Sequence, residues 1–561
     1  MQLILVVGGA IMVTAIARRR GLEPALVLVL VGFVVSFAPK FKGIELPSEV
    51  LLTVVLPPLL YSAALNFSVP TFLRNIRPIL GLGVGLVLVT AFAVAGVAWW
   101  LAPPLTFATA LVLGAVVAPP DAVTAVAVGR KLGLPRKVMA ILKGESLVND
   151  AAALTLFSFA VAQVAGSPEF IDNPVLLFAY STVLGPVVGA GLGYIALWIR
   201  RRLANPGLET IQGLIVPFAA FIAAEHLHAS GVLAVVVAGF VVGHRSLHAG
   251  YQTRLQERCV WNALDVMLEA FVFAYIGLQL RFVLVEVYEA HESLVDVAVA
   301  SVVVLAVVLA VRPACVFLTF GRGVLARQVE TKLSVPVPTW GGLGALGAKQ
   351  RRDRPGWWNA SAAGRSLTLQ ESVVVSWTGM RGVVTLAAAS GIPLTTVYGE
   401  PFPERATIQA IAFAVSVGTL LLQGWTLPPL IRRLQLSSEG DRAHAVAETT
   451  KAERIVYEAA DTALEDFEEN PPPGLDNATA VEIRHHIARH ARDADQMPDP
   501  ESATPEAEAF SALYRRVLGA QRAALIGERD AGGIDDEVVR AMLERLDLQE
   551  ASVTAQLGNR L

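Results

Sequence analysis

Apolar residues occur in runs long enough to cross a bilayer, separated by short polar connections, over the first three quarters of the chain. A membrane-spanning helix needs about 20 such residues, so the pattern predicts about thirteen spans. They lie near residues 2–17, 21–38, 46–65, 78–102, 105–129, 137–165, 172–199, 208–227, 229–243, 260–280, 293–320, 368–392 and 406–431. We predict an all-α polytopic membrane domain, residues 1–434.

After Leu434 the sequence becomes charged and helix-forming, which predicts a cytoplasmic helical tail, residues 435–561, with a regulatory or dimerising role. Its amphipathic segments are Glu453–Glu469, Ala478–Arg492, Pro505–Arg529 and Asp535–Leu557. Residues 321–366 are basic and rich in Gly, Pro and Trp, and they predict a cytoplasmic linker inside the membrane domain.

Composition agrees with this class, with 54% hydrophobic and 17% charged residues. Cys259 and Cys315 both lie in or beside apolar runs, so no disulfide framework or zinc site is expected. The histidines of the tail, His485, His486 and His490, are interpreted as solvated helix residues rather than a metal site. Neither a cofactor nor a nucleic-acid partner is expected.

Basic residues crowd every second connection, as they do in cytoplasmic loops. These connections contain Arg18–Arg20, Arg74 with Arg77, Arg130–Lys137, Arg200–Arg202 and Arg245–Arg258. Because Arg18–Arg20 follow the first apolar run instead of preceding it, that run is a retained span and not a signal peptide. The alternation predicts an external N-terminus and a cytoplasmic C-terminus.

Four polar side chains interrupt the apolar run Val138–Ala165: Glu145, Ser146, Asn149 and Asp150. Carboxylates at membrane depth are costly, so they indicate function. On a helix, Ser146 and Asp150 share one face and Glu145 and Asn149 share another. The first pair offers hydroxyl and carboxylate oxygens to a hard cation such as Na+. The second contains a buried acid that needs a partner. A helix kink or a water-filled pocket is the alternative.

Consecutive prolines in Ala118–Thr124 remove amide donors, so the helix must break inside the membrane and release backbone carbonyls, including that of Pro120, as possible cation ligands. Asp121 then begins the second half-helix, where the dipole favours a carboxylate. A capped kink without ion contact is the alternative. Farther along, Arg381 lies between glycines within Trp377–Thr385 and needs an acid. Glu145 is the candidate partner in a structural ion pair, which leaves Asp150 free to exchange ligands.

These segments resemble the sodium/proton exchangers of the first monovalent cation/proton antiporter family. The resemblance rests on Pro120–Val123, Gly144–Asp150 and Gly379–Ala387, in this order and separation, and it extends over residues 1 to about 434. In the tail, Gly527–Asp530 with Ile534–Glu537 resembles bacterial members. The resemblance implies two inverted six-helix repeats with crossed broken helices, an elevator-type mechanism, and a homodimer in the inner membrane, in contact with lipid.

For the site, the resemblance implies that Asp150 binds sodium or protons in competition, assisted by Ser146 and the Pro120 carbonyl. It also implies that Asn149 marks an electroneutral branch and that Glu145 pairs with Arg381. The expected function is 1:1 exchange of Na+, or Li+, for H+ in pH and sodium homeostasis. The sequence departs from the family pattern at Lys143 and Pro120, and near Tyr61 and Asn66, where other members offer an acid.

Two alternatives stay open. Potassium could replace sodium as the transported cation, because ion size is read from cavity dimensions rather than from sequence. The same scaffold could also form a channel or a non-transporting sensor. A channel favours a polar path along the whole pore, whereas the polar residues of this chain gather at one point.

Overall fold

A computed structural model describes residues 2–38, 51–101, 105–121, 123–166, 173–203, 205–289, 293–333, 367–436, 439–469 and 505–558. Every regular element in these ranges is a helix, and one isolated β-bridge joins Thr395 and Pro401. The predicted tail helix at 478–492 and the tail histidines lie outside the described residues. The chain forms two compact units. The first contains most of residues 1–437, and the second contains 205–207, 245–258 and 438–561.

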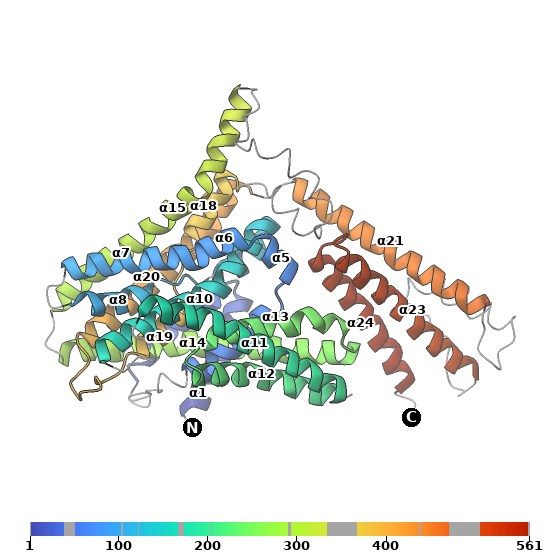
Figure 1. Ribbon diagram of the computed structural model, residues 1–561, viewed down its shortest axis with the longest axis horizontal. Helices are drawn as coiled ribbons and strands as arrows, with labels where there is room; N and C mark the ends of the chain where they lie inside the picture. The colour runs from blue at the N-terminus through green and yellow to red at the C-terminus, as the bar shows by residue number, and fades with distance from the viewer. Residues whose placement is uncertain are drawn as a thin grey trace. The chain divides into compact units, whose positions relative to one another are not determined.

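The first half of the membrane unit is a series of apolar helices with two interruptions by π-helical turns. Its elements are α1 Gln2–Arg19, α2 Pro24–Val35, η2 Leu51–Val55, α4 Leu56–Leu65, α5 Val69–Arg74, α6 Ile76–Leu80, η3 Gly81–Gly85, α7 Leu86–Leu101, α8 Phe107–Val117, α9 Val123–Leu132 and α10 Arg136–Ala165. Helices α7 and α8 lie side by side, and α10 packs against α8 (Figure 1). The predicted break at the prolines is therefore present, between α8 and α9.

The second half contains the longest helices. Its elements are α11 Pro174–Leu203, α12 Pro206–His226, α13 Gly231–Arg245, η4 Ser246–His248, α14 Tyr251–Glu289, α15 Leu294–Leu333, α18 Leu369–Trp377, α19 Val383–Ser390 and α20 Arg405–Leu434. Residues 378–382 separate α18 from α19, as Arg381 and its glycines suggest. Helix α15 continues through residue 333, so the first part of the predicted 321–366 linker is helical. Residues 334–366 are outside the described part of the chain.

Eight of the described helical stretches are long and apolar enough to cross a bilayer, and three shorter apolar helices accompany them. The broken helices fall below span length because each half is counted separately. The predicted number of about thirteen spans therefore stays a prediction.

The membrane unit has two apolar cores rather than one. The larger is built from α1, α2, α7–α9, α14, α15 and α18–α20, and the smaller from α4 and α11–α13 with Trp261 of α14. Helix α10 belongs to both, because Ile141 and Leu156 pack in the larger core while Leu147 and Ala151 pack in the smaller one. The helix with the polar segment thus lies where the two cores meet.

Helix α11 approaches α13 closely through a row of glycines at spacing four, Gly185, Gly189 and Gly193. A Cβ at Gly189 would overlap the backbone of Ala234. Small residues at this spacing let membrane helices pack at short distance. The outward faces of α11 and α12 remain apolar and exposed, with Leu176, Ile195, Trp198 and Ile215 among the exposed side chains. Such faces fit a lipid environment.

The second unit is a helical tail in which α21 Glu439–Glu469, α23 Pro505–Asp530 and α24 Asp536–Gly558 lie along one another (Figure 1). Residues 245–258, between two membrane helices, belong to this unit as well. The tail motif near Gly527–Glu537 makes contacts inside the tail. The Lys451 ammonium of α21 donates to Glu528 Oε1 at 2.9 Å and to the Gly533 carbonyl at 2.6 Å.

Candidate ion-binding site

Helix α10 brings the four predicted polar side chains to the interior of the membrane unit. Glu145, Asn149 and Asp150 are 1%, 0% and 8% exposed, and Ser146 is half-buried. The helix comes this close to its neighbours because Gly144 has no side chain, and a Cβ there would overlap Ile79 of α6. The predicted helical spacing holds, since all four lie within one continuous helix.

The two interrupted helices meet beside α10. The amide of Asp121, in the α8–α9 break, donates to the Met380 carbonyl in the α18–α19 break at 2.5 Å. The Asn149 amide group donates from Nδ2 to the Pro120 carbonyl at 2.6 Å. A Cβ at Gly382 would overlap the Asp121 carboxylate, so this crossing requires glycine. The structure thus brings Pro120, Asp121 and Asn149 together, and the Pro120 carbonyl accepts a hydrogen bond from Asn149.

The ion pair of Glu145 differs from the prediction. Its partner is Arg312 of α15, which donates from Nη1 to Oε1 at 2.5 Å and from Nη2 to Oε2 at 2.9 Å. Arg312 also donates from Nε to the Val375 carbonyl at 3.0 Å, at the end of α18. The fork of a guanidinium matches a carboxylate in this bidentate way. The prediction that Glu145 pairs with Arg381 is therefore wrong.

Arg381 has another role in the structure. It donates from Nε to the Val117 carbonyl at 3.1 Å and from Nη1 to the Gly379 carbonyl, while its own amide donates to Thr419 Oγ1 at 3.0 Å. These are carbonyls that an uninterrupted helix would have satisfied. A cation at the last turn of α8 is also favoured by the negative end of the helix dipole. Arg381 therefore replaces hydrogen bonds that the two breaks remove.

Beside these hydrogen-bonded groups, some buried oxygen atoms have no hydrogen-bond donor and could bind a cation. Within the described residues Asp150 makes no hydrogen bond or ion pair, and Oδ1 of Asn149 is buried with no hydrogen-bond partner. The carboxylate of Asp121 is near enough to Asp150 to interact with it electrostatically. Carboxylate, amide and hydroxyl oxygens are ligands that hard cations prefer. A cation bound at Asp150 would also reduce the repulsion between the two acids.

Two groups of this scaffold, Arg312 and Asp265, were not singled out from the sequence. Arg312 is an arginine inside an apolar run, which is the signal that identified Arg381, and applying that rule to residues 293–320 would have found it. Asp265 of α14 is the other, and its Oδ2 accepts a hydrogen bond from the Ser62 hydroxyl of α4 at 2.7 Å. It lies inside the predicted span 260–280, where an acid is equally costly.

Comparisons with known proteins identify the family of this chain. A family model described as "Sodium/hydrogen exchanger, transmembrane" matches residues 4–433. An uncharacterised Na+/H+ exchanger of Mycobacterium tuberculosis is 30% identical over 98% of this chain and 95% of its own. A Bacillus pumilus protein named sodium, potassium, lithium and rubidium/H+ antiporter is 27% identical, over 79% of this chain and 62% of its own.

Among solved structures, the sodium proton antiporter MjNhaP1 from Methanocaldococcus jannaschii has a similar fold. Its TM-score is 0.56 at 16% sequence identity, and the match covers 77% of this chain and 97% of that one. The family model and the full-length relative, taken with the crossed helix breaks and the buried acids of α10, identify this chain as a member of the sodium/hydrogen exchanger family.

Proposed function

We propose that this protein exchanges Na+ for H+ across the membrane by binding either ion at Asp150. The observation that supports this most directly is the lack of a protein partner for Asp150 in the described chain, in contrast to the fully paired Glu145. A buried carboxylate without a partner must take up a proton or a cation to be stable. Ser146, Asn149 Oδ1 and the Pro120 region supply further oxygens for the dehydrated cation.

Alternating access would come from movement at α10, where the two apolar cores meet. Separate cores can shift against each other with little repacking inside either one, which is what an elevator-type mechanism needs. We further propose a homodimer in the inner membrane, with the C-terminus cytoplasmic. The exposed apolar faces of α11 and α12 suit a lipid or a second-copy contact.

Potassium is the second candidate for the transported cation. The name of the Bacillus pumilus relative includes potassium, lithium and rubidium. The donor set around Asp150 is made of oxygens, which bind any of these ions, and selectivity depends on cavity size and flexibility. Dissipation of a pH gradient in proteoliposomes, compared for Na+, Li+ and K+, distinguishes the candidates.

The test of the proposal is Asp150→Asn, which keeps the volume of the side chain and removes the exchangeable charge. We expect cation-dependent proton flux to be lost. The variant should still insert into the membrane and elute from a size-exclusion column like the wild type. The control is Glu225→Gln, because Glu225 is exposed and its Oε1 accepts the Gly231 amide at the start of α13, away from the groups of α10. Wild-type flux in the Asp150 variant would contradict the assignment.

A further inference from the structure

A stripe of exposed apolar and aromatic side chains runs along helix α11. Its members are each more than half exposed and are Leu176, Val183, Val187, Tyr194 and Trp198. They follow one another at intervals of seven or four residues, which places them on one face of the helix. At a rise of about 1.5 Å per residue the stripe is about 33 Å long, close to the thickness of a hydrocarbon core. Trp198 therefore marks one boundary of the bilayer, where tryptophan is enriched.

Two exposed arginines continue this face one turn beyond Trp198. Arg201 and Arg202 lie in the last turn of α11, three and four residues after the tryptophan. The guanidinium of Arg202 lies over the Trp198 indole, with Cζ 3.8 Å from the ring centroid. A stacked guanidinium keeps its N–H groups at its edge, so they can still donate. The apolar stripe thus ends in two positive charges at the depth of the lipid headgroups.

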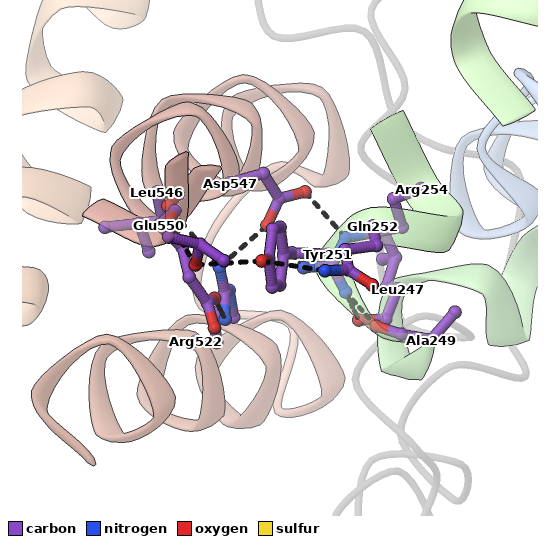
Figure 2. Close-up of polar contacts among 10 residues, drawn as sticks. Leu247, Ala249, Tyr251, Gln252, Arg254, Arg522, Leu546, Asp547 and Glu550 are labelled. Carbon is purple, nitrogen blue, oxygen red and sulfur yellow. Dashed lines mark hydrogen bonds and ion pairs between the residues drawn. The ribbon is translucent and has the colours of Figure 1, made fainter. Parts of the chain in front are cut away.

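Neither of these arginines has an acidic partner in the described chain. The Arg201 side chain makes no hydrogen bond or ion pair there, and Arg202 makes only the ring contact. Arginines of the second unit differ, because Arg254 and Arg522 both bind the carboxylate of Asp547 (Figure 2). The two cations at the end of α11 are therefore available to an anion from outside the chain.

Helix α12 adds apolar surface at the same end of α11. The Gln212 side chain donates from Nε2 to the Ala196 carbonyl of α11 at 3.2 Å, which holds the two helices side by side. Leu208 and Ile211 of α12 are 49% and 55% exposed. The acid in the first two turns of α12 is Glu209, and it is half-buried. The exposed side chains at this end are thus apolar or basic.

We propose that Trp198, Arg201 and Arg202 bind the headgroup of an anionic phospholipid, whose acyl chains lie along the stripe of α11. Guanidinium groups donate paired hydrogen bonds to phosphate oxygens, and acyl chains cover an apolar stripe that a soluble phosphate would leave exposed to water. The predicted cytoplasmic position of these arginines agrees with this partner, because the cytoplasmic leaflet is the anionic one. The site does not depend on the proposed exchange function.

A second copy of the chain fits this end of the stripe less well than a lipid does. A two-fold axis along the membrane normal keeps both copies at the same depth, so it would bring four arginines together at one level. Like charges in an interface oppose association. A phosphate instead neutralises the two arginines of one copy.

The test measures lipid binding to the full-length protein in a neutral detergent, where no charged membrane surface attracts arginines in general. Native mass spectrometry counts bound dioleoylphosphatidylglycerol, with dioleoylphosphatidylcholine as the zwitterionic lipid and glycerol 3-phosphate as the soluble anion. The variants are Arg201→Gln with Arg202→Gln and, separately, Trp198→Leu. The matched control is Arg432→Gln with Arg433→Gln, because these arginines are also consecutive, exposed and in the last turn of a membrane helix, α20.

We expect the wild type to bind phosphatidylglycerol in preference to phosphatidylcholine. The dissociation constant should rise about 25-fold in the double arginine variant, because each arginine near a headgroup contributes about fivefold. Trp198→Leu keeps an apolar side chain but removes the platform under Arg202, so a rise of about threefold is expected. The Arg432 and Arg433 control should bind like the wild type.

Thermal unfolding with added phosphatidylglycerol gives a second measure, because a bound lipid stabilises the folded protein. The upward shift of the unfolding midpoint should be smallest in the double arginine variant, intermediate in Trp198→Leu and unchanged in the control. The milder Trp198→Leu keeps the test decisive if the charge variant does not fold.

Equal binding of phosphatidylglycerol by the wild type and both α11 variants would overturn the site. An equal loss in the Arg432 and Arg433 control would also overturn it, because general charge attraction would then explain the binding. Binding of phosphatidylcholine or glycerol 3-phosphate as tight as that of phosphatidylglycerol would exclude an anionic lipid as the specific partner. Loss of a dimer in the α11 variants, with lipid binding retained, would assign this face to a second copy instead.

Discussion

Arg312 shows how much one buried charge can determine at the residue scale. It satisfies both oxygens of Glu145 and the Val375 carbonyl at once, so three elements, α10, α15 and α18, converge on a single guanidinium. With Glu145 neutralised in this way, Asp150 is the acid of α10 that lacks a protein partner in the described chain. The two carboxylates of α10 differ in their surroundings, which is why different roles are proposed for them.

Arg312→Ala should destabilise the protein by about 3–5 kcal/mol, because Glu145 would remain buried without a counter-charge. The double variant Arg312→Ala with Glu145→Ala should be less unstable than the sum of the two single variants, as expected for contacting residues. Arg454→Ala removes an exposed pair within α21 and should cost less than about 1 kcal/mol. Unfolding midpoints in detergent measure all four, and an Arg312 variant as stable as the control would contradict the role of the pair.

The second residue-scale prediction concerns pH. Acid protonates the Asp150 carboxylate, and the protonated form cannot hold a cation, so the cation concentration for half-maximal exchange should rise as the pH falls. For one proton competing with one cation, the rise approaches about tenfold per pH unit on the acid side. Proteoliposome flux against cation concentration at several pH values gives this slope. A steeper slope would indicate a second titrating acid, and Glu225→Gln should leave the slope unchanged.

The types of residue at the site were predictable, but their pairing was not. Carboxylates in an apolar run stand out from their cost alone, and helical spacing places Ser146 with Asp150. Which arginine meets Glu145 depends on how α15 and α18 pack against α10, and no local pattern in the sequence contains that information. Arg381 was assigned the wrong partner because its bonds go to backbone carbonyls, which every residue has.

At the scale of elements, the crossing of the two helix breaks has the strictest steric requirement. The α8–α9 break follows from consecutive prolines, so it could be predicted. The close approach of the two breaks at Asp121 and Gly382 is a tertiary feature. By contrast, the extension of α15 to Leu333 was missed because glycines in that stretch suggested a loop, and a helix interior tolerates glycine at a cost of only about 1 kcal/mol.

Gly382→Ala should abolish or strongly reduce exchange, because its Cβ would overlap the Asp121 carboxylate and push the two breaks apart. The matched control is Gly96→Ala in α7, where an added Cβ meets nothing within 4 Å. That change should be neutral or slightly stabilising, since alanine favours a helix by up to about 1 kcal/mol over glycine. Proton flux and detergent stability measure both variants, and normal flux in Gly382→Ala would argue against a tight crossing.

For the whole molecule, a single exchanging carboxylate predicts electroneutral transport. Asn149 cannot ionise and Glu145 is paired, so Asp150 would carry either one proton or one monovalent cation on each passage. The exchange rate should then not respond to membrane potential. Imposing a potassium–valinomycin potential on sodium-loaded proteoliposomes tests this, once potassium is shown not to be transported. A clear voltage dependence would mean that Asp121 or another acid titrates during the cycle.

Residues 205–207, 245–258 and 438–561 form one compact unit, and this membership constrains how the chain threads the bilayer. A compact, largely polar unit does not span a membrane, so we expect its three segments to leave the bilayer on the same side. The number of crossings between them must then be even. Among the described helices, α12 and α13 occupy the first interval, and α14, α15, the α18–α19 pair and α20 occupy the second. The even number of crossings follows without any count of charges, and it agrees with the alternation of arginines in the loops.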